Sequence, residues 1–148
     1  MKIYLSELEV ASFARKMMAY CGSSTVVFLS GDLGAGKTTW VRHCCQALGI
    51  DDVVSSPTYS LMNIYRCNDK SVVHLDLYRL GQCDDLSDLC LDDYLTESSC
   101  LFVEWHQGHE EYLPQPDIMI DIAISGKSRC YTLNPCSDLL VAFCQSVK

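Results

Sequence analysis

The feature that most constrains this chain is a glycine-rich segment at residues 31–38, which reads Gly-Asp-Leu-Gly-Ala-Gly-Lys-Thr. It fits the phosphate-binding pattern G-x-x-x-x-G-K-[ST] at every fixed position. An apolar run rich in β-branched residues precedes it at 25–29 and predicts a buried parallel strand. Apolar residues at helical spacing follow it and stop at Gly49, a residue typical of the position just past a helix. This order of strand, loop and helix predicts an α/β fold of the P-loop NTPase type.

The chemistry of such a loop follows from its backbone. Glycines allow a tight turn and a close approach to phosphate, and successive N–H groups form an anion site at the helix N-terminus. Lys37 is predicted to reach the β- and γ-phosphates, and the Thr38 hydroxyl to ligate Mg²⁺. We therefore expect ATP and Mg²⁺ as cofactors. The loop residues assigned to nucleotide binding are Gly31, Asp32, Leu33, Gly34, Ala35, Gly36, Lys37 and Thr38.

Length, charge and hydropathy limit the remaining possibilities. The 148 residues suit one core, so we expect a single domain over residues 1–148. A net charge of −8 opposes direct binding to DNA or RNA, and any RNA is expected to be held by a basic partner. The sequence has neither a membrane-length apolar run nor the apolar core of a signal peptide, which favours a cytoplasmic protein without membrane contact.

Ten cysteines are many for a chain of this length, and an even number raises the possibility of a disulfide framework. A nucleotide-binding loop without a signal sequence favours reducing conditions instead. No C-x-x-C pair is present, which argues against a zinc ribbon. We expect six cysteines that lie among apolar residues to pack as small hydrophobes. They are Cys44, Cys45, Cys90, Cys100, Cys130 and Cys144.

The other elements complete a mixed central sheet flanked by helices. Ser6 and Glu9 form a capping-box pattern at the start of the first helix. Two strands separated by a short turn predict a hairpin, and an acidic stretch predicts a short surface helix. The expected strands are 3–5, 25–29, 61–65, 72–78, 100–105, 118–124 and 129–133, and the expected helices are 7–21, 38–48, 84–94 and 135–147.

A loop rich in hydroxyl groups surrounds Pro57. In nucleotide-binding folds, a loop after the phosphate-loop helix often senses the γ-phosphate and Mg²⁺, although an ordinary solvated turn has the same composition. The following hairpin places His74, Asp76 and Tyr78 on one strand face, since strand side chains alternate. This row predicts either a site or a solvent-facing edge. In a site, Asp76 would bind a metal-bound water or orient the attacking one.

An apolar strand ends in Glu104 and Trp105, the form of a Walker B element at the ligand-binding edge of an α/β sheet. Asp76 is the other candidate for the Walker B acid. We assign Glu104 to water-mediated Mg²⁺ coordination or to activation of water, whereas Trp105 belongs either to the core or near the nucleotide. His106 and His109 lie in a loop and match no strong metal-binding spacing.

Four motifs together resemble the signature set of the TsaE (YjeE) family, and the resemblance spans nearly the whole chain. The resemblance implies a small ATPase that works with the TsaB and TsaD proteins in forming N6-threonylcarbamoyladenosine in tRNA. It also implies slow hydrolysis without those partners, and contact with tRNA only through them. The motifs are Gly31-Asp-Leu-Gly-Ala-Gly-Lys-Thr-Thr39, Ser56-Pro-Thr-Tyr-Ser-Leu61, His74-x-Asp76-x-Tyr78-Arg79-Leu80 and Glu104-Trp105.

The resemblance also implies roles by matching position. Lys37, Thr38 and Thr39 would hold phosphates and Mg²⁺, with Glu104 as a further metal-site residue; Thr58 would belong to a mobile switch loop. Asp76 and Glu104 would be the acids needed for hydrolysis. Trp105 and Arg129 would lie near the nucleotide. The chain departs from the family pattern where Cys90 replaces a usual glycine and where His106 replaces a proline or small residue.

Three other classes remain open at this point. A GTPase is disfavoured because no Asn-Lys-x-Asp guanine motif is present. A small-molecule kinase usually closes an arginine-rich lid, whereas Arg66 and Arg79 are isolated here. A non-hydrolysing, nucleotide-dependent assembly factor is separated from an ATPase only by measuring turnover.

Overall fold

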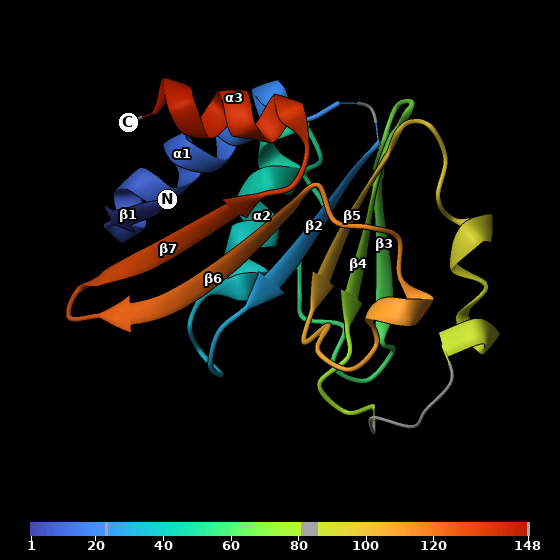
Figure 1. Ribbon diagram of the computed structural model, residues 1–148. Coiled ribbons are helices and arrows are strands. Elements are labelled where there is room, and N and C mark those ends of the chain that lie inside the picture. Colours follow the sequence, from blue (N-terminus) through green and yellow to red (C-terminus); the bar gives the residue numbers. More distant parts are fainter. Residues whose placement is uncertain (23, 81–85, 148) are drawn as a thin grey trace.

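The computed structural model describes residues 1–22, 24–80 and 86–147, which form one mixed seven-stranded sheet with helices packed against it (Figure 1). The strand order is β1-β7-β6-β2-β5-β4-β3. The strands are β1 (Lys2–Leu5), β2 (Thr25–Ser30), β3 (Met62–Cys67), β4 (Lys70–Asp76), β5 (Ser99–Glu104), β6 (Ile118–Ser125) and β7 (Ser128–Pro135). The helices are α1 (Glu7–Tyr20), α2 (Lys37–Ala47) and α3 (Asp138–Ser146), with the 3₁₀ turns η1 (Leu86–Leu89), η2 (Leu91–Asp93) and η3 (Glu110–Tyr112). The predicted α/β class with a mixed sheet is confirmed.

The strand after which the glycine-rich loop begins, β2, lies at the centre of the sheet. It pairs in parallel with both β5 and β6, and β4 pairs in parallel with β5. Register places Glu104 beside Leu29 on one side and beside Asp76 on the other. The loops that follow β2, β4 and β5 therefore emerge at one edge of the sheet (Figure 1). In open α/β sheets this carboxyl edge is where ligands bind.

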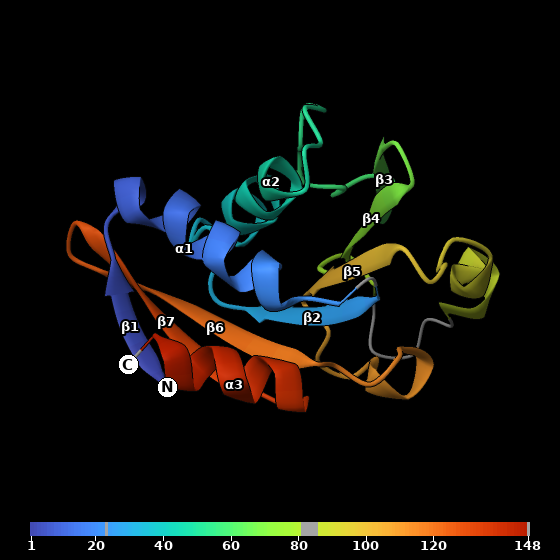
Figure 2. The same cartoon turned by 90° about the horizontal axis from the view of Figure 1, so that it is seen from above.

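The sheet is covered on both faces. Helices α1 and α2 lie on one face, and the segments 86–95 and 106–116 lie on the other (Figure 2). On the helical face, the fully buried Trp40 packs against Phe13 and Tyr131, with ring centroids 6.1 and 5.2 Å apart. On the other face, Phe28 joins a cluster that includes Leu113. Val27 and Leu29 of β2 belong to the core on the helical face and Phe28 to the cluster on the other, so β2 is anchored from both sides. Each such buried side chain contributes roughly 1.5–3 kcal/mol.

The first helix begins as its sequence predicts. Both the backbone N–H and the hydroxyl of Ser6 donate to the Glu9 carboxylate, at 2.8 and 2.6 Å. These hydrogen bonds lower the pKa of the Glu9 carboxyl. Helix α3 contacts α1 and β7, and its Phe143 ring lies 5.4 Å from the Phe13 ring. None of the described helices is both long enough and apolar enough to cross a membrane.

The predicted hairpin is present as β3 and β4, but its second strand differs from the prediction. β4 ends at Asp76, because the chain turns there and the backbone N–H of Tyr78 donates to the Asp76 carboxylate. The prediction that Tyr78 shares a strand face with His74 is therefore wrong. The alternative of a solvent-facing edge is also wrong, because β4 lies between β3 and β5 and its residues from 72 to 76 are buried.

The predicted acidic helix at 84–94 is instead two 3₁₀ turns, η1 and η2, and Asp84 lies outside the described residues. The turns are separated by Cys90, which has left-handed backbone angles (φ 46°). Cys90 is exposed, so the prediction that it packs in the core is wrong. Cys130 is half-buried, while burial is confirmed for Cys44, Cys45, Cys100 and Cys144. None of the cysteines in the described residues forms a disulfide.

We predict that Cys90→Gly stabilises the protein. Left-handed backbone angles cost a residue with a Cβ roughly 1–2 kcal/mol, and glycine adopts them freely. Part of this gain is offset by the larger entropy of glycine in the unfolded chain, so we expect a rise of about 1 kcal/mol in the free energy of unfolding. Chemical denaturation measures it. Cys136→Gly, at an exposed cysteine without positive φ, is the control and should not stabilise. A Cys90→Gly protein less stable than wild type would contradict the assignment of strain.

Candidate functional site

The glycine-rich loop joins β2 to α2 in a conformation that needs glycine. Gly31 has a φ of +138°, and a Cβ at this position would overlap the carbonyl oxygen of Ile122 on β6. Gly36 has a φ of +111° and is the N-cap of α2. The first N–H groups of a helix lack intrahelical acceptors and carry the positive end of its dipole. The loop therefore presents backbone donors of the kind that bind phosphate.

Lys37, the first residue of α2, folds back over this loop. Its side chain is only 5% exposed, and Nζ donates to the carbonyl oxygens of Gly31 and Asp32 at 2.6 and 3.0 Å. Burial lowers the pKa of Lys37, whereas the carboxylates of Glu104 and Asp76 raise it. Nζ also lies 4.3 Å from the centroid of the Trp105 ring. The ammonium group is thus held by neutral carbonyls, which an anionic ligand is able to replace.

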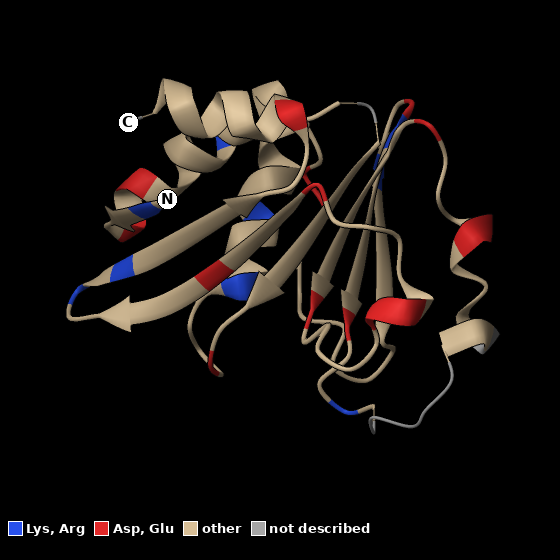
Figure 3. Ribbon diagram, in the orientation of Figure 1, with Lys and Arg blue, Asp and Glu red and all other residues tan. Residues whose placement is uncertain are grey.

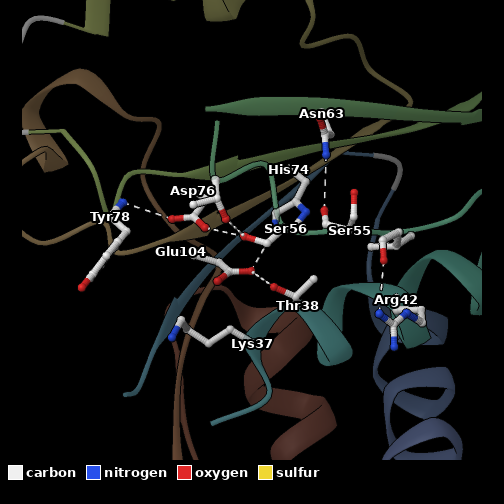
Figure 4. A network of polar contacts seen from close by, with 12 residues as sticks. Lys37, Thr38, Arg42, Ser55, Ser56, Asn63, His74, Asp76, Tyr78 and Glu104 are labelled. Atoms are coloured by element: carbon white, nitrogen blue, oxygen red, sulfur yellow. Dashed lines mark hydrogen bonds and ion pairs between the residues drawn. The ribbon is translucent and has the colours of Figure 1, made fainter. Parts of the chain in front are cut away.

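Two carboxylates face this region from the ends of neighbouring strands. Figure 3 shows the acidic ends of β4 and β5 side by side, and these residues are Asp76 and Glu104. Oε1 of Glu104 accepts a hydrogen bond from the Thr38 hydroxyl at 2.9 Å, and Nε2 of His74 lies at the same distance from that oxygen (Figure 4). The loop helix and two strands therefore meet at one carboxylate.

Asp76 connects the site to the hydroxyl-rich loop after α2. Ser56 donates from Oγ to Oδ2 of Asp76 at 2.7 Å, and its Oγ lies 2.8 Å from Oγ1 of Thr58. The backbone N–H of Asp76 also donates to the carbonyl of Leu61, a residue with a positive φ of 63°. The loop predicted to sense the γ-phosphate thus lies against one of the two acids. Its response to a ligand stays a prediction.

A cavity of about 460 Å³ opens between these elements. It brings together most of the residues that the sequence predicts for the site. They are Leu33, Gly34, Gly36, Lys37, Thr38, Thr39, Thr58, Asp76, Glu104 and Trp105. The structure does not place Gly31, Asp32, Ala35 or Arg129 in its lining; the first three shape the loop itself.

Arg129, on β7, lies on the other side of the loop. Its Nε donates to the carbonyl of Ala35 at 3.1 Å. It lines a second cavity of about 260 Å³, which shares Gly34, Gly36 and Thr39 with the first. Arg129 therefore contacts the glycine-rich loop but does not join the carboxylates, and its place near a nucleotide stays a prediction.

Four further residues belong to the site beyond those given a role from the sequence, which placed His74 and Tyr78 only in a row that predicted either a site or a solvent-facing edge. Ser56, Tyr78 and Arg79 line the cavity, and His74 contacts Glu104 from below it. Arg79 lies 4.4 Å from the centroid of the Tyr59 ring. The sequence signal for His74 was its place two residues before Asp76 on the same strand face. Only the register of β4 with β5 reveals its partner.

Trp105 and His106 follow β5 and leave it in different directions. Trp105 has a positive φ of 58°, and its ring lies at the cavity 4.9 Å from the Tyr78 ring. Such backbone strain in a bulky residue clusters at functional sites. His106 stacks on Phe28 with ring centroids 4.6 Å apart, and its Nε2 lies 3.1 Å from Ser30 Oγ. Within the described part of the chain, no group of three or more His, Cys, Asp or Glu side chains is arranged to hold a metal.

The donor set of the cavity suits one metal ion when phosphate is also present. Mg²⁺ is commonly bound by one or two protein oxygens together with substrate phosphates and waters, rather than by an all-protein cage. Thr38 supplies a hydroxyl and Glu104 a carboxylate at this position. These residues fit Mg²⁺ bound to a nucleotide.

Comparisons with known proteins agree with the motif pattern. Residues 5–131 match the model of the family described as threonylcarbamoyl adenosine biosynthesis protein TsaE. The TsaE protein of Haemophilus influenzae is 40% identical over 97 residues, covering 66% of this chain and 61% of that protein. The chain thus aligns with about three fifths of that relative's length. The TsaE protein of Bacillus subtilis is 36% identical over 118 residues, covering 80% of this chain and 73% of that protein.

A solved structure supports the same grouping. The crystal structure of YdiB from Bacillus subtilis superposes with a TM-score of 0.78 at 28% sequence identity. The superposition covers 99% of this chain and 93% of that chain. The similarity therefore extends over the whole sheet and is not confined to the glycine-rich loop.

We predict that Asp76→Ala loosens the loop at 55–61. Without the carboxylate, Ser56 and the backbone N–H of Tyr78 lose their acceptor, so amide exchange at Tyr78 should accelerate about tenfold, the effect of one hydrogen bond to a charged group. Exchange at Leu61, whose N–H donates to Pro57 within the loop, should accelerate as well. Hydrogen exchange read by NMR measures this. Asp121→Ala removes the same charge from an exposed position on β6 and should leave the loop unchanged. Equal exchange at Tyr78 in wild type and Asp76→Ala would contradict the role of Asp76 as the anchor.

Proposed function

Because the chain belongs to the TsaE family of threonylcarbamoyladenosine biosynthesis, we propose that it binds ATP with Mg²⁺ on the loop at 31–38 and hydrolyses it in support of this tRNA modification. One observation carries the proposal. A single cavity brings the loop lysine, Lys37, together with the hydroxyl of Thr38 and the two carboxylates of Asp76 and Glu104. A cation for phosphate and oxygens for Mg²⁺ and water are what phosphoryl transfer requires.

The binding part of the proposal follows from the loop. The N–H groups at the start of α2 and the ammonium of Lys37 would hold the phosphates, with Lys37 exchanging the carbonyls of Gly31 and Asp32 for phosphate oxygens. The Thr38 hydroxyl donates a hydrogen bond to Glu104, which leaves the lone pairs of the hydroxyl oxygen for the metal. Bound Mg²⁺ would neutralise the charge that develops on the phosphates.

The nucleoside would lie on the side of the loop away from the acids. The two cavities meet at Thr39 and the loop glycines, so a ligand with phosphates at Lys37 continues along the loop toward Arg129. No guanine-recognition motif is present in the sequence, which favours ATP over GTP.

Hydrolysis would depend on the two carboxylates. Glu104 lies where it orients the Thr38 hydroxyl, and Asp76 lies one strand further out, beside the loop at 55–61. A carboxylate at this position is able to accept a hydrogen bond from a water molecule and direct it toward the γ-phosphate. Both side chains are almost completely buried and line the cavity, through which water would reach them.

The partners of the proposed activity are the TsaB and TsaD proteins, and tRNA would be reached only through them. A net charge of −8 disfavours direct binding to a nucleic acid. The loop at 55–61 is the element best placed to couple the nucleotide to these partners, since its Ser56 and Thr58 line the cavity.

The deciding experiment measures ATP turnover by the purified protein alone and after addition of TsaB and TsaD. The proposal expects slow turnover alone and faster turnover with both partners. Nucleotide-dependent assembly with no turnover would identify a non-hydrolysing assembly factor instead.

We predict that Lys37→Ala weakens ATP binding about 100-fold or more, because the variant removes the buried cation that faces the phosphates. Titration with a fluorescent ATP analogue measures the dissociation constant. Lys70→Ala, at an exposed lysine where β4 begins on the opposite edge of the sheet, is the matched control and should bind normally. Unchanged affinity in Lys37→Ala would refute the phosphate-loop assignment.

We predict that Glu104→Ala and Asp76→Ala each lower turnover in the assembled complex about 10²-fold or more while keeping most of the ATP affinity measured without Mg²⁺. The loop and Lys37 would still hold the phosphates, whereas the contacts to the metal and to water would be lost. Steady-state kinetics with TsaB and TsaD present measure turnover, and titration in EDTA measures the affinity. Glu97→Ala, an exposed acid before β5, controls for the change in charge. Normal turnover in either variant would remove that residue from the mechanism.

A further inference from the structure

The most deeply buried ionisable side chain at this site is not one of the two acids. His74, in the middle of β4, is 0% exposed, and its Nε2 lies 2.9 Å from Oε1 of Glu104. The ring of Tyr65 lies 6.4 Å away on the neighbouring strand β3. His74 does not line the cavity and therefore does not touch a ligand there.

The hydrogen bond fixes which ring nitrogen carries the proton. An ionised carboxylate only accepts hydrogen bonds, so Nε2 of His74 must be the donor. Nδ1 has no hydrogen-bond partner among the described residues and lies in the protein interior. A second N–H there would be a buried donor without an acceptor, which costs about 1–3 kcal/mol. The geometry therefore places a proton on Nε2, the ring nitrogen that faces Glu104.

The carboxylate oxygen that His74 contacts also accepts the hydrogen bond from the Thr38 hydroxyl. Oε1 of Glu104 accepts from Thr38 on α2 and from His74 on β4 at equal distances of 2.9 Å. Two donors from different elements fix both the position and the rotation of the carboxylate. Once the carboxylate is fixed, the Thr38 hydroxyl is aimed as well, and its lone pairs point away from Glu104.

We propose that His74 is a positioning residue that sets the Glu104 carboxylate and, through it, the Thr38 hydroxyl in the orientation that receives Mg²⁺–nucleotide. This role rests on the proposed function only where the nucleotide is concerned; the tautomer and the carboxylate contact belong to the free protein. His74 acts without contacting the ligand, much as residues behind a metal ligand orient it.

If His74 had a purely structural role, a different result would be expected. The residues around His74 on β4, such as Val72 and Val73, are apolar and equally buried. If His74 only filled space, an apolar side chain of similar size would replace it without effect on the site. Burying a polar side chain costs free energy unless it is hydrogen-bonded. The hydrogen bond that His74 makes is to Glu104, which it orients.

The first test uses the protein without nucleotide. Long-range ¹H–¹⁵N correlation spectra of the imidazole ring report which nitrogen is protonated. The proposal expects His74 to carry its proton on Nε2, with a resonance that shifts when Glu104→Ala removes the acceptor. An Nε2 without a proton, or a His74 resonance indifferent to Glu104→Ala, overturns the proposal whatever the protein binds.

The second test separates orientation from packing. ATP affinity is measured with Mg²⁺ and with EDTA for wild type, His74→Leu and His74→Gln, because the glutamine amide offers an N–H close to the position of Nε2. Val72→Ala is the matched control, since it leaves a cavity in the same strand without touching Glu104. Thermal unfolding of each variant gives its stability.

We expect the gain in ATP affinity that Mg²⁺ provides to be about tenfold smaller in His74→Leu than in wild type, which is the effect of one hydrogen bond to a charged group. The ATP affinity of this variant in EDTA should stay within about twofold of wild type. His74→Gln should recover most of that gain. Val72→Ala should lower the unfolding temperature and leave the gain unchanged. A full Mg²⁺ effect in His74→Leu, or a loss in His74→Gln equal to that in His74→Leu, overturns the proposal. A wild-type protein that fails to bind ATP refutes the proposed function, and the tautomer measurement still decides on His74.

Discussion

The site depends on one carboxylate oxygen, Oε1 of Glu104, on which the loop helix and two neighbouring strands converge. Thr38 reaches it from α2 and His74 from β4, while Glu104 itself ends β5. The contact exists only because parallel pairing places Asp76 opposite Glu104 and keeps His74 within reach. A slip of β4 by one residue would turn His74 to the other face and leave the carboxylate with one donor. The functional geometry is therefore a consequence of sheet register.

The same arrangement explains how charges are tolerated at a nearly dry edge of the sheet. Lys37, Asp76 and Glu104 are each at most 5% exposed. Isolated burial of any of them would be costly, but each has hydrogen-bond partners, and the carboxylates favour the charged form of Lys37. Two acids and two cations, Lys37 and Arg79, line the cavity, so its formal charges balance before any ligand arrives. A nucleotide would add the negative charge of its phosphates, which a divalent cation would offset, so ATP and Mg²⁺ are expected to bind together.

Much of the fold could be predicted from the sequence because its signals are local. The glycine-rich loop, the capping box at Ser6 and the alternating pattern of β6 each depend on residues close together in the chain. The incorrect predictions concern features that depend on contacts between residues far apart in the chain. β4 ends at Asp76 because the chain turns there and that carboxylate accepts a hydrogen bond from the Tyr78 amide. The exposure of Cys90 follows from a turn that apolar neighbours did not reveal. The partner of His74 was invisible without the register of β4 and β5.

Asp76 has two roles that compete for the same atoms. In the structure its Oδ2 accepts from Ser56 and its Oδ1 from the Tyr78 amide, so its carboxylate closes the loop at 55–61 onto the end of β4. In the proposed reaction, a carboxylate oxygen of Asp76 must instead accept from a water molecule near the γ-phosphate. Ser56 and Thr58 line the same cavity and would then be free to turn toward the phosphate. In that reaction, binding of the nucleotide and release of the loop would be coupled through one side chain, without any motion of the sheet. Such a coupling needs only an exchange of hydrogen-bond partners at Asp76, and it places the moving element on the surface, where a partner protein is able to detect it.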